Sequence, residues 1–235
     1  MTSSWQAAAS TLVTDLRGVF GDRLASIVAY GPQLEGRTEA PLTCLALVSD
    51  LTIADLEACA RRAAHWQRSR IATPLLLPRA EFLRSLDAFP LEYGEIVRAH
   101  SRVYGDDPFT DVTIAREDLR RALETQVKSH LLHLREGFID AGGRPGAVAD
   151  LVTASAPAFA ALLRHVAWLD GATHGDRVQA ARDGARAAGI ADRIAGEMLA
   201  LEQGTPMAQS DPARLVPEYL DAVEQLARTV DAWRC

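Results

Sequence analysis

The strongest indication of the fold is the stretch Leu24-Ala25-Ser26-Ile27-Val28-Ala29-Tyr30-Gly31-Pro32. Its apolar part is prone to β structure, and the pair Gly31-Pro32 is typical of turns. A second apolar run, residues 42–48, follows after a polar loop, and both runs predict buried strands. Before them, residues 5–20 carry apolar side chains near the helical period. The chain is therefore expected to open with one helix and two strands.

Helices and strands continue to alternate up to residue 112. Thr52 followed by Asp55 is the spacing of a capping box, which predicts a helix N-terminus. The further elements expected in this part are a strand over 71–77, a helix from Pro78 to Leu86, a helix over 89–100 and an edge strand over 102–104. Together these elements predict a small mixed β-sheet with flanking helices over residues 1–112.

The pattern changes beyond residue 112, where helical periodicity dominates and no convincing strand is found. The expected helices cover residues 118–138, 157–169, 176–188, 190–201 and 212–233. They predict an all-helical bundle over residues 113–235. The expected fold class is therefore α+β, with a sheet domain over 1–112 and a helical-bundle domain over 113–235.

Charge and composition exclude several kinds of partner. The chain has 25 Lys and Arg against 31 Asp and Glu, and no dense basic cluster that would follow a phosphate backbone, so no nucleic-acid partner is expected. No apolar run approaches the ~20 residues needed to cross a bilayer, and the N-terminus does not resemble a secretory signal. Cys44, Cys59 and Cys235 are widely and irregularly spaced, which suits neither a disulfide framework nor a zinc site. We expect a cytoplasmic protein with reduced thiols and no membrane partner.

The order of helix, strand ending in glycine, loop and second strand resembles the opening of bacterial nucleotidyltransferase-superfamily proteins. Residues 86–92, 103–109 and 119–136 are similar to recurring stretches of the same proteins, so the resemblance covers roughly the first 140 residues. It implies the two-domain plan of the aminoglycoside-modifying members, which bind substrate between their domains.

The motif of that family is Gly-Ser, a loop with a second glycine, and Asp-x-Asp on the next strand. Its glycine and serine let backbone N–H groups approach nucleotide phosphates, and its carboxylates hold magnesium ions. The corresponding positions in this chain carry Gly31, Pro32, Gly36, Thr43 and Leu45. Proline has no N–H to donate, and neither threonine nor leucine supplies an anionic oxygen. The strand over 71–77, where active members carry a third carboxylate, contains no acid. The resemblance thus implies a degenerate motif with no metal site and no cofactor.

The resulting expectation is a catalytically inactive nucleotidyltransferase-fold protein that binds a small molecule or a protein partner in the cleft between its domains. The candidate ligand-binding residues are Gly31, Arg37 and Thr43 in the first domain and Glu124, Lys128 and Arg135 on the long helix of the second. The three helical residues share one face, and Glu124 with Lys128 forms an i,i+4 pair. A solvated, salt-bridged surface is the alternative interpretation of that face.

Two other functions remain open. One is an active, magnesium-dependent nucleotidyltransferase acting on a small hydroxyl or amine substrate, with metal ligands recruited from Glu35, Glu39 or Asp50. The other is an interaction module that forms a homo-oligomer, with Trp168 or Trp233 as an anchor.

Two groups of side chains are of the types that bind metals, but their positions in the sequence favour a structural role. Asp50 lies at a strand end and Asp55 in the first turn of a helix, where capping is the commoner task of a carboxylate. His130 and His133 share one helix at a three-residue spacing, but no third ligand has suitable spacing. No zinc site is expected.

Overall fold

The computed structural model describes residues 4–34, 39–172, 176–205 and 212–233. The chain divides into two compact units, Met1–Ile114 and Ala115–Cys235. We call them unit 1 and unit 2 and describe each by itself. The division falls two residues after the end of the domain expected over 1–112.

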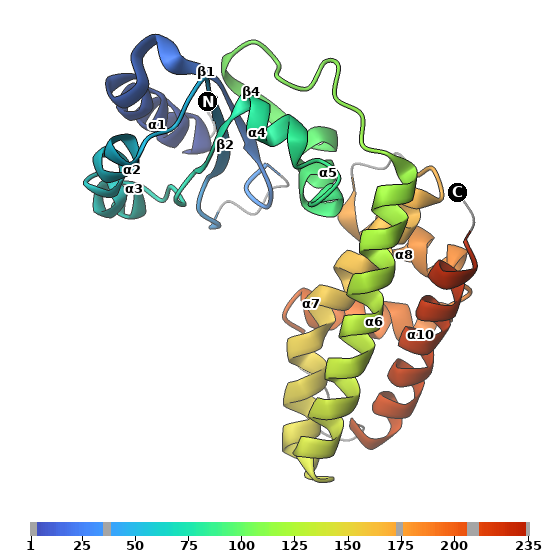
Figure 1. The fold of residues 1–235 in the computed structure, drawn as a ribbon. Helices are drawn as coiled ribbons and strands as arrows, with labels where there is room; N and C mark the ends of the chain where they lie inside the picture. The colour runs from blue at the N-terminus through green and yellow to red at the C-terminus, as the bar shows by residue number, and fades with distance from the viewer. Residues whose placement is uncertain (1–3, 35–38, 173–175, 206–211, 234–235) are drawn as a thin grey trace. The chain divides into compact units, whose positions relative to one another are not determined.

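Unit 1 is built on a mixed sheet of the kind that the sequence predicted (Figure 1). Its strands are β1 (Leu24–Tyr30), β2 (Thr43–Val48), β3 (Leu75–Pro78) and β4 (His100–Gly105). They lie in the order β3-β2-β1-β4, so that β4 is an edge strand, as expected. β1 pairs antiparallel with β2 and β4, whereas β2 pairs parallel with β3. The end of β1 and the start of β2 therefore lie at the same edge of the sheet.

The helices of unit 1 are α1 (Ser4–Phe20), α2 (Ile53–Ala60), α3 (Ala63–Arg68), α4 (Arg79–Arg84) and α5 (Pro90–Arg98), with a 3-10 turn at Gly21–Arg23. The predicted capping box is confirmed, since Thr52 and Asp55 bond reciprocally at the start of α2. The strand expected over 71–77 is shorter than predicted. Ile71 forms only an isolated bridge with Leu42, and β3 begins after Pro74, which has no N–H for a ladder.

The two faces of the sheet carry two separate hydrophobic clusters. Side chains alternate along a strand, so Ala29 and Ala46 lie in one cluster and Val28 and Leu45 in the other. The first cluster packs against residues that include Leu12 and Leu16 of α1, Cys59 of α2 and Trp66 of α3. The second packs against Phe82 of α4, Tyr93 and Ile96 of α5, and Phe109. Both faces of the sheet are thus covered.

The described residues of unit 2 form helices joined by turns and contain no strand. Its helices are α6 (Arg116–Ala141), α7 (Pro145–Leu169), α8 (Arg177–Ala187), α9 (Asp192–Glu202) and α10 (Pro212–Ala232). The prediction that α7 begins at Pro157 was wrong, because Pro145 occupies the first turn and Pro157 lies inside the helix. Pro157 is exposed, so water can satisfy the carbonyl group that an interior proline leaves without a partner. The other predicted helices are present with ends shifted by a few residues.

α7 qualifies the expectation that no segment could cross a bilayer. An 18-residue window of this helix has a mean hydropathy of 1.6, so α7 is long and apolar enough by length and composition alone. The core helix of a soluble protein meets the same criterion. Side chains of α7 such as Val152, Phe159 and Leu163 are fully buried within unit 2, and 39% of the apolar window is buried.

Candidate functional site

The edge of the sheet at the end of β1 is where the sequence predicted the motif positions, and we call it the Gly31 edge. Gly31 has a φ of +82°, and the N–H of Leu34 donates to its carbonyl at 3.0 Å, closing a turn that contains Pro32. A Cβ atom on Gly31 would meet nothing within 4 Å. The backbone conformation, and not lack of space, therefore requires glycine here.

Thr43 and Leu45 lie on β2, directly beside β1, as the alignment with the family motif predicted. Thr43 is opposite Tyr30 and Leu45 is opposite Val28, so all four side chains point to the same face of the sheet. Thr43 is half-buried at the edge, whereas Leu45 is fully buried in the cluster with Phe82 and Phe109. The residue that the sequence aligned with the second carboxylate is thus part of the apolar packing.

Three polar side chains form a row across the sheet at the Gly31 edge. Tyr30 is in register with Thr43 on β2 and with His100 on β4, and all three are half-buried. The ring of Tyr30 packs against the hydrophobic cluster around Leu45. Burial raises the pKa of the Tyr30 phenol, so the phenol is neutral at physiological pH.

His100 is held by partners on both of its ring nitrogens. Nδ1 lies 3.1 Å from the carbonyl oxygen of Val97, and Nε2 lies 3.4 Å from Oδ2 of Asp107. The pKa of Asp107 is lowered because the backbone N–H of Phe109 donates to it at 2.9 Å and because His100 lies beside it. Because both ring nitrogens have partners, the side chain of His100 is held in place at the Gly31 edge and is not free to act as a general base.

Gln33 adds a buried amide to the same edge, in the turn that follows Gly31. The residue is 8% exposed, and its Oε1 atom is buried without a hydrogen-bond donor among the residues that the structure describes. Buried side-chain oxygens nearly always have a partner. The amide oxygen of Gln33 is therefore a polar atom that the described residues leave unsatisfied.

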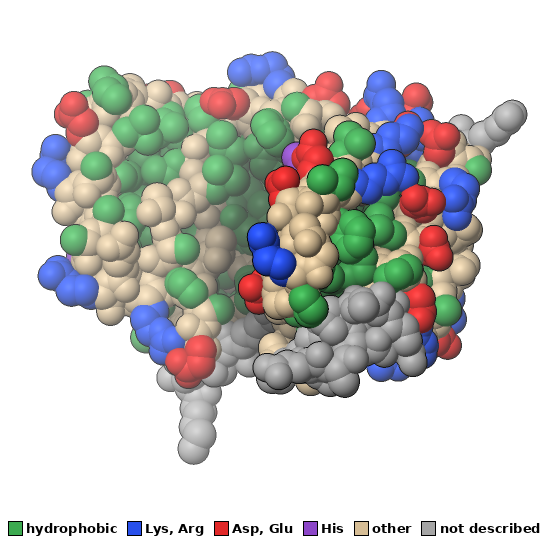
Figure 2. All heavy atoms as spheres, turned by 90° about the horizontal axis from the view of Figure 1, so that it is seen from below, with side chains coloured by type: hydrophobic (Ala, Val, Ile, Leu, Met, Phe, Trp, Pro, Cys, Tyr) green, Lys and Arg blue, Asp and Glu red, His purple; other side chains and the backbone are tan. Residues whose placement is uncertain are grey.

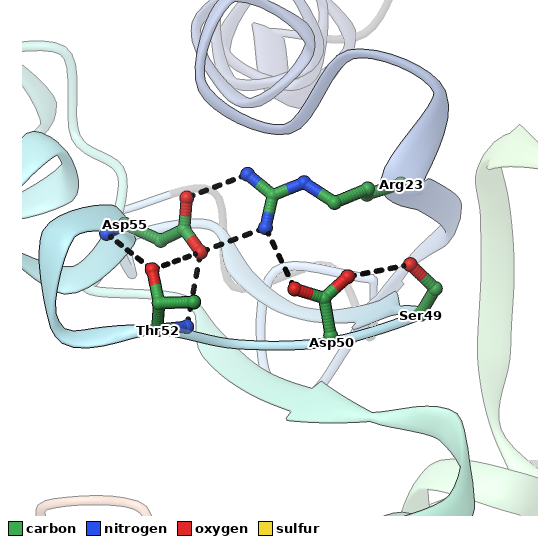
Figure 3. Close-up of polar contacts among 5 residues, drawn as sticks. All are labelled: Arg23, Ser49, Asp50, Thr52 and Asp55. Atoms are coloured by element: carbon green, nitrogen blue, oxygen red, sulfur yellow. Dashed lines mark hydrogen bonds and ion pairs between the residues drawn. The ribbon is translucent and has the colours of Figure 1, made fainter.

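The opposite edge of the sheet, where β1 begins and β2 ends, carries a closed polar network that we call the Arg23 network (Figure 3). Arg23 donates to both carboxylate oxygens of Asp55, at 2.7 and 2.8 Å, and to Asp50 at 3.1 Å. The hydroxyl of Thr52 donates to Asp55 at 2.7 Å, and that of Ser49 donates to Asp50 at 3.0 Å. Arg23 and Thr52 hold the pKa of Asp55 well below its usual range.

These contacts bear on the metal ligands that the active-transferase alternative requires. Asp50 belongs to the Arg23 network, and Glu39 pairs with Arg70 at 2.9 Å. Glu35, like Gly36 and Arg37 of the predicted site, lies outside the described residues. No group of three or more potential metal ligands is found among the residues that the structure describes.

The polar face of α6 pairs with α10 inside unit 2. Lys128 bonds to Glu124 on its own helix and to Asp231 of α10 at 3.0 Å. Arg135 pairs with Glu224 of α10 at 2.7 Å. Lys128, followed by Arg120, lowers the pKa of Glu124. The face thus carries the salt-bridged surface that was the alternative interpretation, and a ligand at these residues stays a prediction.

The two histidines of α6 have separate partners. His130 Nε2 lies 2.7 Å from the hydroxyl of the fully buried Tyr219, and its ring stacks against Phe159. Burial lowers the pKa of His130 to about 4. His133 is exposed and pairs with Glu136 at 3.1 Å. His130 is therefore engaged in buried packing, and His133 in a surface contact.

The residues suggested for oligomerisation and the thiols have ordinary environments. Trp168 and Trp233 are half-buried, and Trp168 lies against His165. Burial raises the pKa of the Cys44 thiol to about 12, and Cys235 lies outside the described residues.

Large hydrophobic side chains are exposed elsewhere, at Ile53, Leu56, Leu75, Leu83, Phe89, Leu132, Phe138 and Ile139. Figure 2 shows hydrophobic side chains in both the left and the right part of one face, with charged side chains around and between them.

Comparison with known proteins identifies the fold. A scan against protein-family models and a search of curated proteins found no match. Among solved structures, the chain matches a nucleotidyltransferase. That structure is spectinomycin adenyltransferase AAD(9) from Enterococcus faecialis with ATP and spectinomycin, with a TM-score of 0.55 and 13% sequence identity over 96% of this chain and 98% of that chain. The likeness confirms a nucleotidyltransferase-like fold, and a fold alone does not establish an activity.

Gly31 and Thr43 were candidate residues from the sequence, whereas Tyr30, Gln33 and His100 join the candidate site only from the structure. The sequence predicts Tyr30 only as the last residue of a strand, and its position directly before Gly31 is the one signal for a role in the site. Gln33 lies in the loop after Gly31, where polar residues are common. Only its burial, which the sequence does not show, marks it as a candidate. His100 enters the site only through the register of β4 with β1, which sequence alone does not supply.

Proposed function

We propose that this chain is a nucleotidyltransferase-fold protein that does not carry out metal-dependent nucleotidyl transfer and that binds a small molecule at the Gly31 edge of unit 1. The observation that carries the proposal is the environment of Leu45. It stands at the second carboxylate position of the motif and is fully buried in an apolar cluster. A divalent cation needs anionic oxygens at such a place, and burying a charge there without them is costly.

The backbone of the motif loop supports the same proposal. In active relatives the residue after the glycine offers an N–H to phosphate, and here that residue is Pro32, which has none. The N–H of Leu34 is already bonded to the carbonyl of Gly31. The turn thus lacks two of the donors that would cradle a triphosphate. The free thiols of Cys44 and Cys59 support a cytoplasmic location as a further part of the proposal.

Calorimetric titration of the intact chain with ATP, with and without magnesium, tests the proposal. The neighbouring structure contains ATP and spectinomycin, so both serve as probes. We expect no magnesium-dependent binding of ATP and no transfer of its adenylyl group to spectinomycin. A ligand that binds only the folded state stabilises it by RT ln(1 + [L]/Kd), so thermal unfolding gives an independent readout. Magnesium-dependent binding of ATP, or adenylylated product, contradicts the proposal.

A second candidate function, an interaction module, is favoured by one observation. Leu132, Phe138 and Ile139 are 58%, 40% and 76% exposed along one stretch of α6. Neighbouring exposed hydrophobic side chains mark contact surfaces more often than chance. Solution mass at several protein concentrations tests it, because Ile139→Glu should abolish a concentration-dependent increase in mass if α6 forms the contact.

A further inference from the structure

We propose that Tyr30, Gln33 and Thr43 recognise an uncharged part of the ligand that both donates and accepts hydrogen bonds, such as the hydroxyl groups of a sugar or the edge of a nucleobase. This inference rests on the proposed function, because it names the chemistry of the ligand at the same edge of unit 1. It differs from the family motif, which holds phosphate through metal ions.

The first step is that Tyr30 and Thr43 are neighbours on the sheet and that Gln33 follows Tyr30 by three residues in the adjoining turn. Tyr30 and Thr43 are directly opposite each other in the register of β1 and β2, so their side chains are neighbours on one face. Gln33 lies in the turn that begins at Gly31, directly after Tyr30. His100 closes the row on the side of β4.

The second step is that these side chains have no hydrogen-bond partner among the residues that the structure describes. Oε1 of Gln33 is buried without a donor. The hydroxyl groups of Tyr30 and Thr43 make no hydrogen bond to any residue that the structure describes. Leaving the buried Oε1 of Gln33 unsatisfied costs stability, whereas the half-buried Tyr30 and Thr43 are open to partners from outside the protein. A ligand that supplies the missing partners explains why polar residues stand here.

The third step concerns the charge of the ligand. The three side chains are neutral, and the pKa of Tyr30 is raised further by burial. The adjacent ionisable groups are engaged with each other, since His100 faces Asp107 and Arg70 pairs with Glu39. Pro32 offers no N–H to an anion. Amide and hydroxyl groups with both donors and acceptors match neutral polar groups of a ligand and cannot neutralise a phosphate.

The apolar surface beneath the row supplies the remaining contact area. The ring of Tyr30 packs on the cluster of Val28, Leu45 and Phe109 and remains half-buried. A rigid aromatic ring with a polar tip suits a ligand that has one apolar face and one polar edge. Small-molecule sites combine such surfaces with a few polar groups that fix orientation.

The experiment compares thermal unfolding of the intact wild-type chain with that of Gln33→Met, Tyr30→Phe and Thr43→Val. Each protein is measured in buffer that contains EDTA, first without probe and then with millimolar adenosine, guanosine, cytidine, glucose or myo-inositol. Without probe, each variant should melt at or above the wild-type temperature, because the group that it removes has no protein partner. At least one uncharged probe should raise the melting temperature of wild type, and all three variants should lose most of that rise.

Tyr219→Phe is the matched control, because it also removes a phenol oxygen but from a buried hydroxyl that is bonded to His130. It should lower the melting temperature and leave the rise caused by the probe intact. The inference is overturned if no uncharged probe stabilises wild type, if the variants keep the full rise, or if all three melt below wild type without probe. Magnesium-dependent stabilisation by ATP overturns the proposed function instead, so the two failures are distinguishable.

Discussion

The two edges of the β1–β2 pair carry similar numbers of polar residues but use them differently. In the Arg23 network, Asp55 accepts from Arg23 and Thr52, and Asp50 accepts from Arg23 and Ser49. At the Gly31 edge, the side chains of Tyr30, Gln33 and Thr43 find no hydrogen-bond partner among the described residues.

This difference separates polar residues that build the fold from those available to a ligand. Carboxylates attract attention as catalytic candidates, but both acids of the Arg23 network have their charge compensated by Arg23. Polar groups without partners cost stability, and they are expected at binding sites and not in the scaffold. The Gly31 edge is therefore the better candidate site although it contains no acid on β2.

The largest expected effect comes from placing a charge at the Gly31 edge. Leu45→Asp buries a carboxylate in an apolar cluster and should lower the free energy of unfolding by about 4 kcal/mol. Thr43→Asp, at the half-buried neighbouring position, should cost about 1 kcal/mol or less. Urea unfolding of both variants checks this. A Leu45→Asp protein as stable as wild type would show that the cluster accepts an anion, and with it a cation.

A buried polar pair in unit 2 extends the comparison to a third place. His130 is bonded to Tyr219, and burial lowers its pKa from 6.5 to about 4. The unfolded state therefore binds a proton more tightly, and stability is full above pH 6.5 and is lost as the pH falls toward 4. The loss should reach about 3 kcal/mol. In His130→Gln this part of the pH dependence should be absent, as measured by urea unfolding at several pH values. A His130→Gln protein with the same pH dependence of stability as wild type would contradict the assignment of this loss to His130.

The most direct comparison of the two edges removes one hydroxyl from each. Thr52→Val removes the capping hydroxyl of α2 and should cost about 1 kcal/mol. Thr43→Val removes a hydroxyl without a partner and should change the free energy of unfolding by less than about 0.5 kcal/mol. Both changes keep the shape of the side chain, so chemical unfolding isolates the hydrogen bond. Equal costs at the two sites would remove the distinction between the edges.

The smallest effect is expected at Arg70, which has a φ of +58° and lies after the end of α3. Glycine adopts this left-handed conformation at lower cost, whereas Arg70→Gly loses the exposed ion pair with Glu39. The relief of about 1 kcal/mol should slightly exceed the loss of the pair. Arg70→Asn, which tolerates the same conformation, is the control. A clearly destabilised Arg70→Gly protein would mean that the contact with Glu39 stabilises the fold more than an exposed pair usually does.

Sequence predicted the parts of the fold that depend on local patterns. The apolar run that became β1 and the Thr52–Asp55 capping box each contain their own signal within a few residues. The start of α7 was misplaced because Pro145 and Pro157 carry the same local signal, and only packing decides between them. β3 was predicted too long, since its apolar residues look the same whether or not they join the ladder.

The candidate site was predictable only where it follows the motif. Thr43 and Leu45 were placed on the correct strand from the spacing after Gly31. The burial of Gln33 and the approach of His100 depend on contacts between distant parts of the chain. The same is true of Arg135, whose partner Glu224 lies on another helix. Such pairings cannot be read from one sequence.

Calorimetric titration of manganese into wild type and into Pro32→Ser/Thr43→Asp/Leu45→Asp tests the central claim most directly. The triple variant places two carboxylates on alternate residues of β2, where they point to the same face and can share a cation. If it folds, it should bind manganese and still show little or no transferase activity, because positioned phosphates and an in-line acceptor are also needed. Wild type should show no binding at all. Binding of manganese by wild type with micromolar affinity, lost in Thr43→Val, would contradict the account of the Gly31 edge as a site without metal.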